Sequence, residues 1–257
     1  MGVVNVTPDS FYAGSRHNSV SEVLSTVARM VEEKADIIDV GGYSTRPGAA
    51  EVQAEEEEKR VVGVLKAIRR EFPDLVLSVD TFRSSVAEAA RSEAGVDMIN
   101  DISGGELDKK MFNLIASLNI PYVMMHMQGT PATMQKNPTY NDVVSDIIEW
   151  FGKRIPLLED SGVKDVIVDP GIGFGKTIEQ NFELIRRLSE FQVLSRPVMA
   201  GVSRKSLIWK TLGITPAEAL NGTTALNMAL LMNGASIIRV HDVNEAAETV
   251  SLYQKIG

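Results

Sequence analysis

The stretch Ile37-Ile38-Asp39-Val40-Gly41-Gly42-Tyr43-Ser44-Thr45-Arg46-Pro47-Gly48 contains the unit on which the interpretation of the fold depends. Its first part, Ile37–Val40, is a short and mostly apolar run with β-branched side chains. Such a run is too continuously apolar for a sheet with one face in water, so it predicts a parallel strand that is buried on both faces. The glycine-rich polar segment that follows then lies at the carboxyl end of that strand.

The same unit recurs along the 257-residue chain, with longer amphipathic segments between the apolar runs. We count eight strand candidates: Gly2–Val6, Ile37–Val40, Leu75–Val79, Met98–Asn100, Pro121–Met125, Asp165–Val168, Pro197–Ala200 and Ile237–Val240. Helices are expected near Ala54–Phe72, Ser84–Glu93, Met111–Leu118, Asn141–Asp160, Arg204–Leu212 and Asn244–Ile256. No linker or shift in composition divides the chain. We therefore predict an α/β fold with one domain over residues 1–257, a single (β/α)8 TIM barrel, for which this length is typical.

Several local signals predict where individual helices begin and end. Capping boxes are expected at Ser19-x-x-Glu22, Thr177-x-x-Gln180 and Thr215-Pro216-x-Glu218. Glycines at 95, 162 and 234 suit left-handed helix ends before a strand. Lys34 stands at the corresponding place before the second strand. A left-handed lysine would cost roughly 1–2 kcal/mol, so we expect that turn to be built differently.

Composition excludes several classes of protein. Cysteine is absent, which excludes disulfides and cysteine-based metal sites and fits a reducing cytoplasm. The net charge is −8 and the basic residues are scattered, so nucleic acid is not an expected partner. The first residues do not resemble a signal peptide, and no apolar stretch is long enough to span a bilayer, so no membrane association is expected.

Almost every expected strand ends in residues that can bind or react. The strand ends carry Asn5 and Asp9, Asp39 with the segment 41–48, Asp80, Asn100 and Asp101, His126, Asp169, the run 203–206, and Arg239 with His241. In a barrel these ends form one face, where active sites lie. In an open doubly wound sheet, the alternative that spacing does not exclude, they would be spread along an edge. The series of polar ends favours the barrel.

The residue types at these ends suggest a substrate. Asp80, Asn100, Asp169 and Lys205 combine donors and acceptors that suit a flat heterocycle with adjacent N–H groups and a carbonyl. A second set, Arg46, Arg239 and His241, suits a phosphate or diphosphate. Asn5 and Asp9 offer oxygen atoms, the ligands that Mg²⁺ prefers together with substrate phosphates.

Two other kinds of chemistry receive little support. No serine lies in a recognisable Ser-His-Asp context, and the histidines do not show metal-binding spacing. The stretch Gly171–Thr177 resembles a P-loop, but only three residues separate Gly171 from Gly175-Lys176-Thr177, where the P-loop has four.

Seven motifs, taken in chain order, resemble those of the dihydropteroate synthase family. They are Asn5-Val6-Thr7-Pro8-Asp9-Ser10-Phe11, Gly41-Gly42-Tyr43-Ser44-Thr45-Arg46-Pro47-Gly48, Val79-Asp80-Thr81, Asn100-Asp101-Ile102, Asp169-Pro170-Gly171-Ile172-Gly173-Phe174-Gly175-Lys176, Ser203-Arg204-Lys205-Ser206 and Arg239-Val240-His241-Asp242-Val243. The resemblance covers the whole chain. It implies a Mg²⁺-dependent transfer of a pterinylmethyl group from its diphosphate to 4-aminobenzoate, by a dissociative displacement, in a homodimer.

The resemblance also implies a role for each site residue. For the pterin these are Asp80, Asn100, Asp169 and Lys205, with Ile102, Met125, Phe174 and Gly201 lining the slot and Arg239 stacking on the ring. For the diphosphate and Mg²⁺ they are Asn5, Thr45, Arg46, Arg239 and His241, with Asn5 as the metal ligand. For 4-aminobenzoate they are Phe11, Thr45, Pro47, Phe174, Lys205 and Ser206. The expected catalytic set is Asn5, Asp9, Arg46, Lys205, Arg239 and His241, and the loops around Asp9 and Arg46 are expected to close over the site.

The chain departs from the family pattern in two places. Tyr43 stands where the family commonly has glutamate, and the sequence begins inside the first expected strand, where members usually carry further N-terminal residues. Two alternatives share the pterin pocket: a pterin-dependent methyltransferase domain and a non-catalytic pterin-binding protein. The first does not need the first two motifs or Ser203–Ser206, and the second would be expected to have lost Asn5, Arg46, Lys205 or Arg239.

Overall fold

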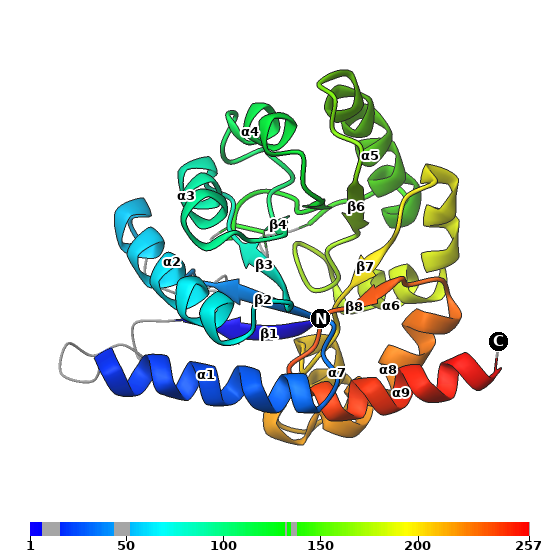
Figure 1. Ribbon diagram of the computed structural model, residues 1–257. Coiled ribbons are helices and arrows are strands. Elements are labelled where there is room, and N and C mark those ends of the chain that lie inside the picture. The colour runs from blue at the N-terminus through cyan, green and yellow to red at the C-terminus, as the bar shows by residue number, and fades with distance from the viewer. Residues whose placement is uncertain (7–15, 44–51, 132, 135–137, 257) are drawn as a thin grey trace.

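A computed structural model describes residues 1–6, 16–43, 52–131, 133–134 and 138–256. Among these residues, eight short parallel strands form the centre of the molecule (Figure 1). They are β1 (Gly2–Asn5), β2 (Ile37–Gly41), β3 (Val76–Asp80), β4 (Met98–Asp101), β5 (Tyr122–Met125), β6 (Val166–Asp169), β7 (Met199–Ala200) and β8 (Ile237–Ile238). All eight strand candidates of the sequence are confirmed.

Backbone pairing closes the strands into a barrel. Strands β1 to β6 are hydrogen-bonded in chain order, and β7 pairs with β8. Parallel bridges join Val168 to Val198 and Gly2 to Val240, and the Val3 N–H donates to the Val240 carbonyl at 3.0 Å. The last contact joins the two ends of the chain, so the sheet has no open edge there. The expectation of a barrel, and not an open sheet, is confirmed.

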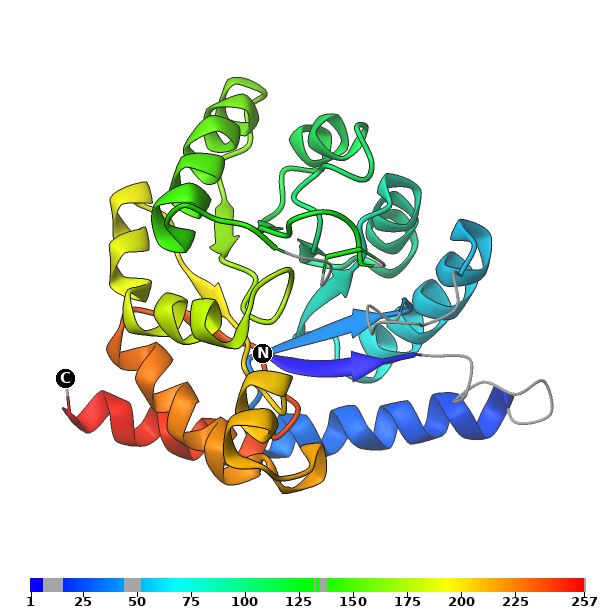
Figure 2. The same ribbon diagram turned by 180° about the vertical axis from the view of Figure 1, so that it is seen from behind.

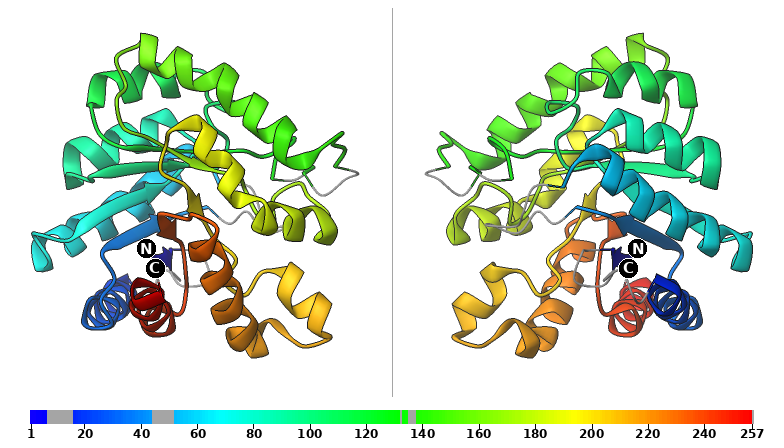
Figure 3. Two further views of the ribbon diagram at one scale, coloured as in Figure 1. Left: turned by 90° about the vertical axis from the view of Figure 1, so that its right-hand side faces the viewer. Right: turned by 90° about the vertical axis from the view of Figure 1, so that its left-hand side faces the viewer.

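Helices surround the strands on the outside (Figures 1 and 2). They are α1 (Arg16–Glu32), α2 (Ala54–Glu71), α3 (Ser84–Ala94), α4 (Met111–Leu118), α5 (Val143–Asp160), α6 (Ile178–Arg186), α7 (Ser206–Leu212), α8 (Leu220–Met232) and α9 (Val243–Ile256), with 3₁₀ turns η2 (Leu188–Leu194) and η3 (Pro216–Glu218). Helices α1 and α9, from opposite ends of the chain, follow one another along the same side of the barrel (Figures 1 and 3). No described helix is both long enough and apolar enough to cross a membrane.

Alternation along the strands separates the core from the site. In β2, Ile38 and Val40 are fully buried in the main apolar cluster between the strands and the helices. Asp39 stands between them and is also fully buried, but its carboxylate bonds to side chains from β4 and the end of β8. Successive strand residues point to opposite faces, so Asp39 points into the barrel. The interior of the barrel is therefore polar near the carboxyl ends of the strands.

The observed helix starts confirm some of the predicted ones and contradict others. The capping boxes at Thr177 and Thr215 are confirmed, although the second caps the short turn η3. The box at Ser19 was wrong, because α1 already begins at Arg16 and Ser19 lies inside it. The expected helix start at Arg204 was also wrong: this residue has a φ of 54°, so α7 begins only at Ser206.

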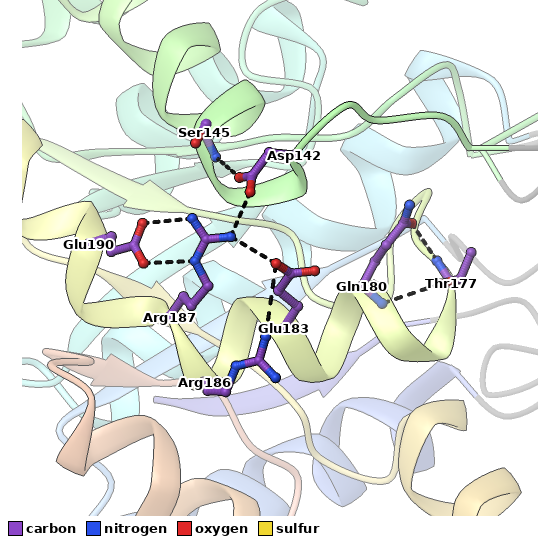
Figure 4. Close-up of polar contacts among 8 residues, drawn as sticks. All are labelled: Asp142, Ser145, Thr177, Gln180, Glu183, Arg186, Arg187 and Glu190. Atoms are coloured by element: carbon purple, nitrogen blue, oxygen red, sulfur yellow. Dashed lines mark hydrogen bonds and ion pairs between the residues drawn. The ribbon is translucent and has the colours of Figure 1, made fainter.

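Arg187 connects α5, α6 and η2 through a network of carboxylates (Figure 4). Its guanidinium donates to Asp142 and Glu183, each at 2.8 Å, and to both oxygens of Glu190 at 2.7 and 2.9 Å. Asp142 also caps α5 by accepting a hydrogen bond from the Ser145 N–H. The hydrogen bond from Arg187 holds the pKa of Asp142 well below its usual range. This network joins the segments that flank β6, which carries Asp169.

The turn before β2 differs from the expectation. Lys34 adopts a left-handed conformation with a φ of 69°. The Lys34 N–H donates to the Val31 carbonyl, and the Ala35 N–H donates to the Met30 carbonyl at 2.8 Å. Gly162 after α5 and Gly234 after α8 close their helices with the same pair of hydrogen bonds, so the prediction of a different turn at Lys34 was wrong. The exposed lysine accepts the strained backbone because the two hydrogen bonds satisfy the last carbonyls of α1.

We expect Lys34→Gly to stabilise the protein by about 1 kcal/mol, because glycine removes the clash of a left-handed Cβ and loses only part of that gain as chain entropy. Urea unfolding measures the difference. Lys34→Ala is the matched control, since it removes the same charge but keeps the Cβ, and should give no such gain. Equal stabilities of the glycine and alanine variants would contradict the idea of strain at this position.

Candidate active site

An ion-pair network inside the barrel joins four strands near their carboxyl ends. Arg239 Nε donates to Asp39 Oδ2 and Arg239 Nη2 donates to Asp80 Oδ2, both at 2.7 Å. Asn100 Nδ2 donates to the same Asp39 oxygen at 2.9 Å. The network brings Asp80, Asn100 and Arg239 together, as expected from their positions at strand ends. It adds Asp39, to which sequence reasoning assigned no role.

The charges of this network do not cancel. Two carboxylates share one guanidinium, and Asp39 Oδ1 is buried without a hydrogen-bond partner among the described residues. Burial raises the pKa of Asp80, and the nearby Asp39 raises it further against the opposing effect of Arg239. A buried oxygen without a partner is costly. The network therefore favours a ligand that brings N–H donors or positive charge.

Asp169 and Lys205 form a second polar pair beside this network. Asp169 is 6% exposed, and its Oδ1 accepts a hydrogen bond from the Gly171 N–H at 2.7 Å. Burial raises the pKa of Asp169, and Lys205 is the strongest influence that lowers it. Lys205 Nζ donates to the Ile172 carbonyl at 2.6 Å, and burial lowers the pKa of Lys205 to about 8. A hydrogen-bond acceptor, Asp169, and a hydrogen-bond donor, Lys205, thus lie near each other.

An apolar wall adjoins the polar groups. Ile102, Met125, Met127 and Met134 form a buried cluster, and Phe82 and Phe174 pack against it. Lys205 Nζ lies 4.7 Å from the centroid of the Phe174 ring. The structure therefore brings the three apolar residues expected in the slot, Ile102, Met125 and Phe174, into one cluster next to Lys205. Such a wall suits one face of a flat ring.

Gly201 leaves room at the end of β7. A Cβ at this position would lie 3.2 Å from the Arg239 carbonyl oxygen and 3.8 Å from Lys205 Nζ. A larger residue would therefore crowd the Arg239 carbonyl, whereas its contact with Lys205 would be an ordinary one. This contact gives a steric reason for glycine at a position that the sequence placed in the slot.

The remaining expected residues lie further out. Asn5 is exposed at the end of β1, and Ser206 is exposed at the start of α7. His241 is exposed, with Nδ1 3.1 Å from Ser203 Oγ. The residues expected in the first two loops lie outside the described part of the chain: Asp9, Phe11, Thr45, Arg46 and Pro47. Among the described residues, no three His, Asp or Glu side chains gather as a metal site.

Two motif residues have structural partners. Asp101 accepts hydrogen bonds from the Tyr122 hydroxyl and from the Ser103 and Gly105 N–H groups, so it shapes the loop after β4. Arg204 donates two hydrogen bonds to Asp242, at 2.9 and 2.8 Å. These contacts fix the backbone next to Asn100 and next to Lys205. Asp39, in contrast, was noted as a polar strand end but given no role, because a single carboxylate inside an apolar strand does not indicate which partner it meets.

Comparison with known proteins identifies the family. The model of the pterin binding enzyme family matches residues 1–241. The dihydropteroate synthase of Escherichia coli K12 is 41% identical over 256 residues, which covers 99% of this chain and 90% of that protein. The chain belongs to the dihydropteroate synthase family. Solved dihydropteroate synthases agree with this: the one from Yersinia pestis, bound to a sulfonamide drug, has a TM-score of 0.93 and 40% identity and covers 100% of this chain and 93% of its own. The Xanthomonas albilineans enzyme with 4-aminobenzoic acid has a TM-score of 0.91 and 38% identity, with coverage of 100% and 92%.

The family assignment favours the synthase over the methyltransferase domain. These relatives are named as dihydropteroate synthases and not as methyltransferases, and the match extends over nearly the full length of both chains. The likeness to a P-loop has no structural counterpart, because Lys176 is 4% exposed and donates to the Phe174 carbonyl at 2.9 Å. A lysine in that position is turned into the protein and not toward a phosphate.

Proposed function

We propose that the chain condenses (7,8-dihydropterin-6-yl)methyl diphosphate with 4-aminobenzoate to give 7,8-dihydropteroate and diphosphate, a step of folate biosynthesis. The observation that supports this most strongly is the arrangement of Asp169, Lys205 and the Asp39–Asp80–Arg239 network around one end of a barrel of this family. Relatives bound to 4-aminobenzoic acid and to a sulfonamide support the second substrate.

The pterin is oriented by complementary hydrogen bonds. The carboxylate of Asp169 accepts from the ring N–H and the adjacent amino group, and Lys205 donates to the ring carbonyl. Asn100 and Asp80 contact the opposite edge. Lys205 then exchanges its hydrogen bond with the Ile172 carbonyl for one with the substrate. The ring lies between the apolar wall and the guanidinium of Arg239.

The reaction is a dissociative displacement. No described serine or histidine forms a nucleophile–base pair with an acid partner, which fits a reaction without a covalent enzyme intermediate. The C–O bond to diphosphate breaks first, and the electron pair leaves with diphosphate. The arylamine nitrogen then bonds to the pterin methylene carbon and releases a proton to solvent. The negative charge of Asp39, and that of Asp80 when it is ionised, stabilises the positive charge that develops on the pterin.

Mg²⁺ fits the donors at the mouth of the barrel. Asn5 is exposed at the end of β1, and its amide oxygen is a suitable single ligand for a hard cation that takes its other ligands from phosphate and water. Asn5 would hold the ion, and Arg46 and His241 would contact the diphosphate. The ion supplies charge neutralisation for the leaving diphosphate.

We expect ordered binding, with the pterin diphosphate first. The pterin residues Asp80, Asn100 and Asp169 lie on strand ends, whereas three residues assigned to 4-aminobenzoate, Phe11, Thr45 and Pro47, belong to segments whose sequence predicts no packed element. Calorimetry should detect little binding of 4-aminobenzoate to the free protein, and pterin, pyrophosphate and Mg²⁺ together should restore it. Omission of Mg²⁺ is the control for the metal. Tight binding of 4-aminobenzoate to the free protein would rule out this order.

The proposal includes a homodimer in the cytoplasm. Three large apolar side chains on α8 and α9 are well exposed: Met232 at 57%, Leu252 at 62% and Ile256 at 64%. Helices α8 and α9 pack against each other, so an apolar surface on this pair suits the association of two copies. Sedimentation of the protein, with Leu252→Glu as the comparison, tests the dimer: wild type should sediment as two chains and the variant as one.

A further inference from the structure

Lys176 is a buried lysine to which the proposed reaction assigns no role. It is 4% exposed and follows the glycine-rich turn after β6. Its Nζ donates to the Phe174 carbonyl at 2.9 Å and to the His126 carbonyl at 3.4 Å, and it lies 3.2 Å from His126 Nδ1. All three contacts are with neutral groups. A lysine is rarely buried unless its ammonium is paired with an opposite charge, so a carboxylate near Lys176 is expected.

His126 is suited to accept a hydrogen bond from this ammonium. Burial lowers the pKa of His126 to about 2, and Lys176 contributes to the same shift, so the imidazole is neutral. The ring packs edge-on against Trp150, with 5.1 Å between the ring centroids. A neutral imidazole with its proton on Nε2 leaves Nδ1 free to accept from Lys176. The three donors of the ammonium therefore have three acceptors in a rigid setting.

The contacts of Lys176 hold the turn that carries part of the site. A Cβ on Gly171 would lie 2.0 Å from the His126 carbonyl oxygen, so this turn sits directly on the end of β5. Lys176 fixes the turn from one side through Phe174, and Lys205 binds its Ile172 carbonyl from the other. Both lysines thus donate to backbone carbonyls of the turn that follows Asp169.

Lys176 also acts on Asp169 through its charge. Burial raises the pKa of Asp169, and Lys205, Lys176 and Arg239 are the cations that lower it. Asp169 in turn favours the charged form of Lys176, whereas burial and Lys205 disfavour it, which places the pKa of Lys176 at about 7. Arg239 is committed to Asp39 and Asp80, and Lys205 is the group that must turn to the substrate. At pH values below about 7, Lys176 is then the cation that stays beside Asp169 when Lys205 turns to the substrate.

We propose that Lys176 is a positioning residue for pterin binding: its buried ammonium fastens the Gly171–Phe174 turn to the end of β5 and keeps a positive charge beside Asp169. The proposal rests on Asp169 as the pterin anchor. Asp169 accepts from two adjacent N–H groups of the pterin only when both of its oxygens are acceptors, which requires the ionised carboxylate. Pterin binding therefore weakens as the pH falls through the pKa of Asp169. Removal of Lys176 raises that pKa and moves the loss to higher pH.

Lys176→Gln tests the proposal, because the amide keeps a donor for the Phe174 carbonyl but carries no charge. We would measure the affinity for 6-hydroxymethylpterin by calorimetry between pH 4.5 and pH 7. The acid midpoint of binding should rise by about one pH unit, the size of shift that one nearby charge produces. Lys176→Met is a second uncharged variant, should the glutamine variant not fold.

Asn181→Ser is the matched control for the turn. Asn181 is 4% exposed and accepts a hydrogen bond from the Gly173 N–H at 2.6 Å, so this change loosens the same turn without removing charge. It should weaken binding at all pH values without moving the midpoint. If the uncharged variants of Lys176 give the same unchanged midpoint, the proposal is overturned. Asp169→Asn, measured alongside, separates the two possible failures: an unchanged affinity there would mean that the anchor itself is wrongly assigned.

Discussion

Arg239→Lys should reduce turnover at least about 100-fold while the protein remains folded. The guanidinium of Arg239 reaches Asp39 through Nε and Asp80 through Nη2, each at 2.7 Å. A lysine keeps the positive charge between the two carboxylates, which protects the fold. Lysine lacks the two separated donors that reach both carboxylates, and it lacks the flat face on which a pterin can stack. The variant therefore loses the hydrogen bonds to both carboxylates in their present geometry and the stacking contact with the ring.

Arg69→Lys is the matched control for this change. Arg69 also binds a carboxylate, Asp97 at 2.6 Å, and it donates to the carbonyls of Pro73, Leu75 and Gly95. These contacts lie before β3 and β4, at the opposite end of the barrel from Asp80 and Asn100. Its replacement should lower the melting temperature and leave turnover nearly unchanged. Near-normal turnover of Arg239→Lys would refute the dual role of Arg239.

Asp169→Asn should weaken pterin binding at least tenfold. The substitution replaces the acceptor oxygens of Asp169 with an amide, whose NH₂ group faces the N–H donors of the pterin. The loss of a charged hydrogen bond costs about 1.5–3 kcal/mol, or roughly tenfold to a hundredfold in affinity. The amide also loses the attraction of Lys205 and Lys176. Calorimetry with a pterin measures the change at pH 7.

The control for Asp169 comes from the same strand. Asp165 is exposed just before β6, at the opposite end of the strand from Asp169. Asp165→Asn removes one negative charge at that end and should leave the pterin affinity unchanged. Equal affinities for wild type and Asp169→Asn would show that the pterin is anchored elsewhere.

The strands could be predicted from the sequence because a buried parallel strand must be apolar on both faces, as in the run Val166–Val168 before Asp169. Closure of the barrel could not be read from spacing, since it depends on the pairing of Gly2 with Val240. The polar strand ends indicated which residues meet, and Asp80, Asn100 and Arg239 do meet. Their connection through Asp39 was not predictable.

Two of the three local predictions that failed, those at Lys34 and Ser19, show what the sequence alone does not contain. Lys34 takes the strained left-handed conformation because the turn before β2 needs the two hydrogen bonds that close α1. The two hydrogen bonds of the turn outweigh the preference of lysine for a negative φ. Ser19 resembled a helix start because an apolar periodicity begins at Val20, but that periodicity marks the buried face of α1 and not its first residue. At Lys34, the structure of the turn overrides a local preference.

Formation of dihydropteroate by the purified protein is the measurement that tests the account most directly. The protein is incubated with (7,8-dihydropterin-6-yl)methyl diphosphate, Mg²⁺ and labelled 4-aminobenzoate, and the labelled product is separated by chromatography. Asp165→Asn, which leaves the site intact, is assayed beside Arg239→Lys. The account predicts that wild type and Asp165→Asn form labelled dihydropteroate at similar rates, that Arg239→Lys forms at least about 100-fold less, and that omission of the pterin diphosphate abolishes it. Absence of labelled dihydropteroate from a folded wild-type protein that binds the pterin would contradict the proposed condensation.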